Sequence, residues 1–127
     1  MKITALYAAL LAVLFIVLSV RTLSYRRSRK VEIGDGGDRE LLRRIRVHSN
    51  FAEYVPIALI LIGFAESLGL WAPAVHGLGV LLLAGRAVHA YGLSQTPHIL
   101  AMRVAGMTAT FTAIGVAAAA CLWFALH

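Results

Sequence analysis

Four long stretches of apolar residues alternate with shorter polar segments along the chain. Each stretch is close to the roughly 20 residues that a helix needs to cross the hydrocarbon core of a bilayer. The pattern therefore predicts an all-α membrane protein folded as one domain, a four-helix transmembrane bundle. We expect the four spans at about residues 3–25, 39–68, 74–92 and 98–126.

The first apolar stretch follows Lys2, so a cleavable signal peptide is an alternative interpretation of it. The uncharged run from Ile3 to Val20 is long, and a basic segment follows it in place of a small-residue cleavage site. We therefore expect this segment to be retained as the first membrane helix.

Several residues mark where the expected helices begin, meet or end. Asp38 precedes the second span and is a suitable N-cap, because its carboxylate can accept hydrogen bonds from the free N–H groups of the first turn. Glu66, near the far end of the same span, is expected to be solvated at the membrane interface. Glycines in the third span would allow a close approach of neighbouring helices: Gly77, Gly79 and Gly85.

Composition and charge support the membrane assignment. The chain has 127 residues, of which 60% are hydrophobic and 14% are charged, and a soluble domain of this size would expose much of that apolar surface. Nine of the twelve Lys and Arg residues lie between Arg21 and Arg46. Such a cluster could bind nucleic acid, but between two apolar spans it is more typical of a cytoplasmic loop. We predict no nucleic-acid partner, a cytoplasmic loop at residues 26–38 and both termini on the outer side.

Three polar residues stand at the mouth of the second apolar span. Their spacing of i, i+4 and i+7 places Arg46, Asn50 and Glu53 on one face of a helix. Ionisable side chains are costly within a membrane, which makes them candidates for a functional site. The expected topology brings further polar side chains to the same end of the bundle: Arg86, His89 and Arg103.

The chemistry of these residues leaves several interpretations open. Glu53 could form a purely structural salt bridge with Arg46 or Arg86. Alternatively, arginines bind carboxylates and a buried glutamate holds an ammonium, which together fit a zwitterionic ligand with more than one carboxylate. An arginine beside a thiol would also favour the nucleophilic thiolate. The histidines show no metal-ligand spacing and there is a single cysteine, so we predict no metal site.

The segment from Arg43 to Pro56 resembles the signature of the MAPEG family, the membrane-associated proteins in eicosanoid and glutathione metabolism. The shared pattern is Arg, three residues, Asn, two residues, Glu, then an aromatic residue and, two positions further on, Pro. The resemblance extends over most of the chain and implies a homotrimer that binds glutathione between subunits near the cytosolic side. It implies glutathione as co-substrate, a lipophilic small molecule as second substrate, and membrane lipids as further partners.

The resemblance also implies roles for particular side chains. Arg103 would be the catalytic residue that stabilises the glutathione thiolate. His89 stands at a position that is aromatic in other members, which argues against leukotriene synthase activity. The short chain is more similar to compact bacterial members, so we expect a multi-pass protein of the bacterial inner membrane. The remaining candidate side chains would contact glutathione: Arg46, His48, Asn50, Glu53, Tyr54, Arg86, His89 and Tyr91.

Three functions follow as hypotheses. The first is a membrane-bound glutathione-dependent transferase or peroxidase that activates the thiolate toward lipophilic electrophiles. The second is a non-catalytic glutathione- or lipid-binding membrane scaffold of the same fold. The third is a small proton-coupled exporter that uses Glu53, but its need for access from both sides does not suit ionisable residues gathered at one end.

Overall fold

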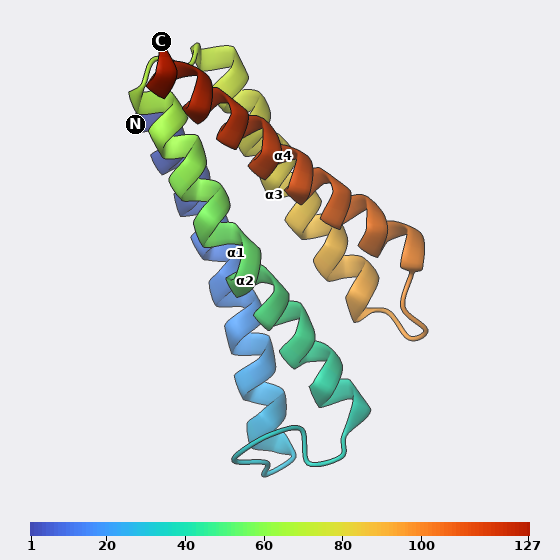
Figure 1. Cartoon of the computed structure of the whole chain (residues 1–127). Helices are drawn as coiled ribbons and strands as arrows, with labels where there is room; N and C mark the ends of the chain where they lie inside the picture. Colours follow the sequence, from blue (N-terminus) through green and yellow to red (C-terminus); the bar gives the residue numbers. More distant parts are fainter.

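The computed structural model describes residues 1–127 and consists of four long α-helices without β-strands (Figure 1). Helix α1 comprises Lys2–Ser28, α2 Arg39–Ser67, α3 Ala72–Ser94 and α4 Leu100–Leu126. All four are long and apolar enough to cross a membrane. The all-α, four-span fold predicted from the apolar pattern is therefore confirmed.

The helices form two antiparallel hairpins, α1–α2 and α3–α4. Both termini lie at one end of the molecule, while the α1–α2 and α3–α4 loops lie at the other, which we call the loop end (Figure 1). Helix α3 packs extensively on α4 and α2 on α1, whereas α1 and α4 do not touch. The hairpins diverge toward the loop end (Figure 1). At the loop end, two long arginine side chains connect the hairpins. Arg43 Nη1 donates to Thr96 Oγ1 at 2.7 Å, and Arg21 Nη1 donates to Ser94 Oγ at 2.8 Å.

Capping and proline placement determine where the helices begin. Asp38 caps α2, because its Oδ1 accepts hydrogen bonds from the backbone N–H groups of Glu40 at 2.9 Å and Leu41 at 3.2 Å. The Leu41 N–H in particular lowers the pKa of the Asp38 carboxyl, to which the Tyr25 hydroxyl also donates. Helix α3 begins at Ala72, two residues earlier than expected, because Pro73 lies in the first turn, where no N–H donor is needed.

Close helix contacts occur at some glycines and not at others. A methyl group at Gly79 would overlap the ring of Tyr7, and one at Gly85 would lie 2.8 Å from Ala109 Cβ. Gly77 faces open space, so its expected role in packing is wrong. A further contact joins Gly106 of α4 to Gly85, and it brings the backbones of α3 and α4 together.

Glu66 is not solvated as the sequence suggested; it caps α1. Its side chain is 12% exposed, and its carboxylate accepts from the backbone N–H groups of Ile3 at 3.0 Å and Thr4 at 2.8 Å. The Thr4 hydroxyl donates to the same carboxylate at 2.6 Å. These are N–H groups that the first turn of a helix leaves unpaired. Glu66 therefore attaches the start of α1 to the end of α2.

We expect the Glu66→Ala substitution to lower the free energy of unfolding by about 0.5–2 kcal/mol, the usual cost of losing an N-cap. The measurement is thermal unfolding of the purified protein in detergent. Glu32→Ala is the matched control, because Glu32 is an exposed loop residue that forms no salt bridge. Equal unfolding temperatures for the two variants would contradict the capping role.

Candidate functional site

A cluster of polar side chains joins α2, α3 and α4 toward the loop end. At its centre is Arg86 of α3, which is 1% exposed. Its Nη2 donates to Asn50 Oδ1 of α2. Its Nη1 lies 3.4 Å from Thr110 Oγ1 and 3.6 Å from Met107 Sδ, both on α4. One guanidinium group thus contacts three helices.

Helix periodicity places His89 beside Arg86. The two residues are three positions apart on α3, and His89 Nδ1 lies 3.4 Å from Arg86 Nη2. His89 is also buried, and its backbone packs against Gly106 of α4. On the other side, the guanidinium carbon of Arg86 lies 6.0 Å from the centre of the Phe51 ring. The close contact of α3 with α4 therefore positions both polar side chains.

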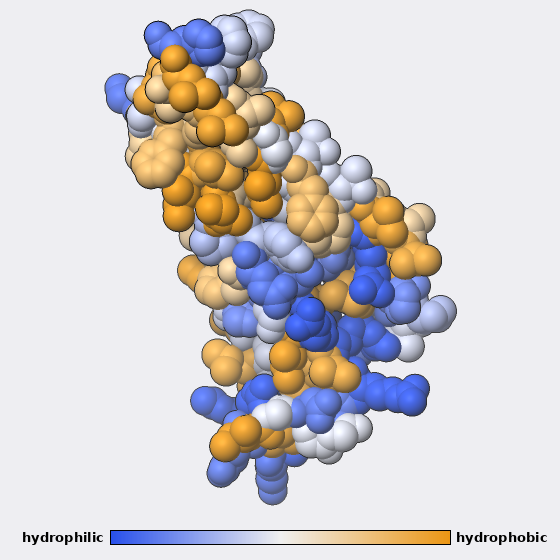
Figure 2. Space-filling model, in the orientation of Figure 1, coloured by the Kyte–Doolittle hydropathy of each residue, from blue (hydrophilic) through white to orange (hydrophobic).

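A groove of about 300 Å³ opens beside this cluster between the three helices. In the space-filling view, hydrophilic residues gather over the loop-end part of the molecule and apolar residues cover most of the opposite part (Figure 2). The groove brings both kinds of side chain together. Its lining is Asn50, His89, Leu100, Arg103, Val104, Met107, Thr108 and Phe111.

The groove and the cluster behind it carry positive charge without a salt-bridge partner. Neither Arg86 nor Arg103 forms a salt bridge. The Nε atoms of both side chains are buried without a hydrogen-bond partner. Buried charges and donors are costly unless they are paired, so the groove favours an anionic ligand with acceptor oxygens. No group of three or more His, Cys, Asp or Glu side chains comes together in the chain.

The structure brings together four of the predicted site residues: Asn50, Arg86, His89 and Arg103. Tyr54 lies at the rim, where its ring packs edge-on against Phe111 at 5.4 Å. Arg46 and Glu53 form an ion pair with each other, with Arg46 Nη1 3.8 Å from Glu53 Oε1. Their side chains are 54% and 49% exposed, so they lie on the outward face of α2.

Two predicted residues lie away from the groove. His48 faces α1, where its Nε2 is 2.9 Å from Ser19 Oγ and its ring stacks on Phe15. Tyr91 is exposed and does not line the groove. Conversely, three residues of α4 that contact the cluster or the groove were not predicted from the sequence: Met107, Thr110 and Phe111. Their positions four, seven and eight residues after Arg103 are the helical spacing that could have indicated them.

The fold and the cluster define a class: an integral membrane protein with a four-helix bundle and a cationic groove toward one end. Residues 4–123 match the model of the MAPEG family, and the chain belongs to this family. It is 40% identical over 122 residues to inner membrane protein YecN of Escherichia coli K12, which covers 96% of this chain and 92% of YecN. YecN of Escherichia coli O6:H1 shows the same identity. The resemblance of the motif around Asn50 to this family is confirmed.

Proposed function

We propose that this protein is a glutathione-dependent transferase or peroxidase that acts on lipophilic electrophiles. The observation that carries the proposal is the groove lined by Arg103 and Asn50, with Arg86 buried behind Asn50; the Nε atoms of both arginines are buried without a hydrogen-bond partner, and neither arginine forms a salt bridge. Glutathione has two carboxylates, and arginine is the side chain best suited to bind them. The chain belongs to the MAPEG family, and the resemblance of its α2 motif to that family implies glutathione as the ligand, which favours this anion over others.

The residues of the groove suit distinct roles in such a reaction. Asn50, held in place by Arg86, would bind a carboxylate of glutathione, while Arg103 would lie near the thiol. A positive charge beside a thiol favours the thiolate, which is the nucleophilic form. The sulfur would then form a bond to an electrophilic carbon, whose leaving group departs with its electron pair while the thiol proton passes to water. With a hydroperoxide, the sulfur would attack the outer oxygen and an alcohol would leave, which gives a sulfenic acid. A second glutathione would then condense with it to form the disulfide and release water.

Arg46 and Glu53 would join the site through a neighbouring subunit. Both are about half exposed on the outward face of α2, and Glu53 carries the charge that an ammonium group requires. We therefore propose a homotrimer in which this face borders the groove of the next subunit. We place the loop end in the cytoplasm, because the basic residues cluster at that end, and we place both termini outside. The similarity to YecN favours the bacterial inner membrane.

The first test is glutathione-dependent conjugation of an aryl halide by the purified protein. We expect saturable turnover, and a decrease in kcat/KM of about 10- to 100-fold for Asn50→Ala, because a hydrogen bond to a charged group contributes about 1.5–3 kcal/mol. Arg39→Ala is the control, since Arg39 is exposed at the start of α2 and does not line the groove. The control should retain wild-type activity.

Two results would point to other functions. Glutathione binding without turnover of aryl halides, epoxides or hydroperoxides would replace the transferase with a non-catalytic binding protein of the same fold. Proton-coupled flux in liposomes that is lost in Glu53→Gln would instead indicate an exporter.

A further inference from the structure

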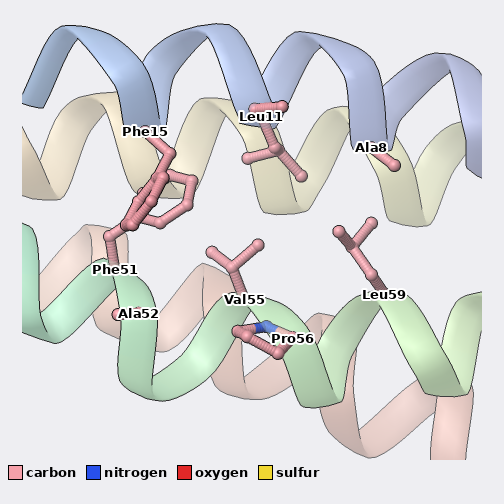
Figure 3. A pocket seen from close by; sticks show the side chains of 9 residues that line it. Ala8, Leu11, Phe15, Phe51, Ala52, Val55, Pro56 and Leu59 are labelled. Atoms are coloured by element: carbon pink, nitrogen blue, oxygen red, sulfur yellow. The ribbon is translucent and has the colours of Figure 1, made fainter. Parts of the chain in front are cut away.

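The two helix hairpins are each held together by packing along their own length. In α1–α2, apolar side chains of both helices meet, and Figure 3 shows Phe15 of α1 against Phe51 of α2. The centres of these two rings are 5.5 Å apart. In α3–α4, the backbones approach closely where Gly106 meets Gly85. Because packed interfaces deform little, we expect each hairpin to move as one unit.

Close contacts also join the two hairpins at the end of the molecule that holds both termini, which we call the termini end. The ring of Tyr7 in α1 fills the space beside Gly79 of α3, where an added methyl group would overlap it. The Tyr7 hydroxyl lies 3.0 Å from His76 Nδ1. Cys121 Sγ of α4 donates to the carbonyl of Leu61 in α2 at 3.3 Å. The hairpins are therefore fixed to one another at this end.

At the loop end, by contrast, the hairpins diverge (Figure 1), and arginine side chains connect them through neutral hydroxyl groups. The contact of Arg43 with Thr96 is exposed to water, so its hydrogen bond exchanges readily for one to water. Arg43 Nη1 also lies 2.7 Å from Glu40 Oε2 on the same helix. Arg43 therefore keeps a charged partner when it releases Thr96, which lowers the free-energy cost of release. The other contact joins Arg21 to Ser94, and the long side chain of Arg21 can follow that hydroxyl over a short distance.

The contact of Arg43 with Thr96 lies across the loop-end opening of the cationic groove. Asn50 follows Arg43 by seven residues, so it lies on the same face of α2 and about 10 Å deeper. On the other side of the groove, Leu100 and Arg103 follow Thr96 at the start of α4. Asn50, Leu100 and Arg103 all line the groove. A water-soluble anion does not reach the groove through the hydrocarbon, where charge is costly, so it enters past this contact.

We propose that the hairpins open at the loop end about the fixed termini end, and that the contact of Arg43 with Thr96 is the latch that controls this movement. Opening admits a water-soluble anion to the cationic groove, and closure retains it. A carboxylate is a stronger acceptor for arginine than a hydroxyl group, so the anion itself favours release of Thr96 as it enters. That this anion is glutathione rests on the proposed function, whereas the latch does not.

The first test measures distances between the hairpins in the protein without ligand, by double electron–electron resonance. Nitroxide labels at Leu42→Cys and His98→Cys span the loop end, and labels at Phe64→Cys and Leu122→Cys span the termini end. All four side chains are exposed. Both pairs are made in a Cys121→Ser background, since Cys121 is the single native cysteine. Labelled chains are diluted with unlabelled ones, so that each distance lies within one chain.

Thr96→Val keeps the shape of the side chain and removes the acceptor of the latch. We expect a new population with a longer distance at the loop end and an unchanged distance at the termini end. Thr112→Val is the matched control, because the exposed Thr112 hydroxyl donates within its own helix, to the carbonyl of Thr108 at 2.8 Å. Arg43→Met breaks the latch from α2, should give the same new population, and keeps the test available if Thr96→Val fails to fold. Arg39→Met, at an exposed position of the same helix, should keep the wild-type distances.

The second test is stopped-flow binding of glutathione. Because the latch forms over both the empty and the occupied groove, Thr96→Val should raise the association and dissociation rate constants by about 3- to 10-fold each, the effect of losing one hydrogen bond. The Kd should change by less than about twofold, since both rate constants rise together. Thr112→Val should keep the wild-type rate constants.

Wild-type distances in both Thr96→Val and Arg43→Met would overturn the proposal, and so would the same new population in Thr112→Val. Wild-type rate constants in a Thr96→Val protein whose loop end has opened would also overturn it, because the movement would then not control entry. A wild type that binds no glutathione would contradict the proposed function instead, and the distances would still test the latch.

Discussion

Replacing Arg103 with alanine is expected to lower the kcat of glutathione conjugation by about 10²–10³-fold, the usual effect of removing one group that stabilises a developing or bound anion. Arg103 lines the cationic groove, and it has no salt bridge and a buried, unpartnered Nε. The Kd of glutathione should change by less than about tenfold, or 1.4 kcal/mol, because Asn50, held by Arg86, would still bind a carboxylate. Steady-state kinetics and calorimetry separate the two effects.

Two comparisons sharpen this prediction. Arg103→Lys should retain more activity than Arg103→Ala, since it keeps the positive charge but loses the planar guanidinium. Arg39→Ala should behave as wild type, because Arg39 is exposed and lies outside the groove. A wild-type kcat in Arg103→Ala would show that Arg103 does not stabilise the thiolate, whatever the affinity of the variant for glutathione.

The Gly106→Ala substitution should destabilise the protein by about 1–3 kcal/mol, the usual cost of overpacking a close contact. An added methyl group would collide with the carbonyl of Gly85 and lie 2.7 Å from the backbone nitrogen of His89. Relief of that collision would move α4 away from α3 and alter the contacts of Arg86 with α4. We therefore also expect weaker binding of glutathione in this variant.

Gly115 provides a control on the same helix. Nothing lies within 4 Å of a methyl group added there, so Gly115→Ala should stabilise α4 by about 0.5–1 kcal/mol through its lower backbone entropy cost. Thermal unfolding in detergent and the Kd of glutathione are the measurements. If Gly106→Ala and Gly115→Ala unfolded at the same temperature, the close contact of α3 with α4 at Gly106 would not be needed for stability.

Helix periodicity explains which of the predicted site residues lie together and which do not. Arg46, Asn50 and Glu53 follow one another along α2 at the helical spacing, but only Asn50 lines the groove, whereas Arg46 and Glu53 are about half exposed. His48 lies between Arg46 and Asn50 in sequence but on another face, where it contacts Ser19 of α1. The family motif treats these neighbours as one group, whereas a helix turns about 100° per residue and separates them.

Contacts between distant segments could not be predicted from local patterns. The carboxylate of Glu66 accepts from the N–H of Thr4, 62 residues away, and nothing near Glu66 indicates this. Likewise, Thr110 contacts Arg86 across 24 residues from within an apolar span. The four helices were predictable because length and hydropathy are local properties, but the partners of buried polar atoms depend on the packing of whole helices.

The central claim is that the cationic groove binds glutathione, and calorimetric titration of glutathione into the purified protein tests it most directly. We predict saturable binding to wild type and to Arg39→Ala. Binding should be lost in Arg86→Met, which removes the guanidinium that contacts Asn50, Thr110 and Met107 but keeps an apolar side chain of similar length. The absence of binding to wild type, or equal affinity of folded Arg86→Met and wild type, would contradict the account.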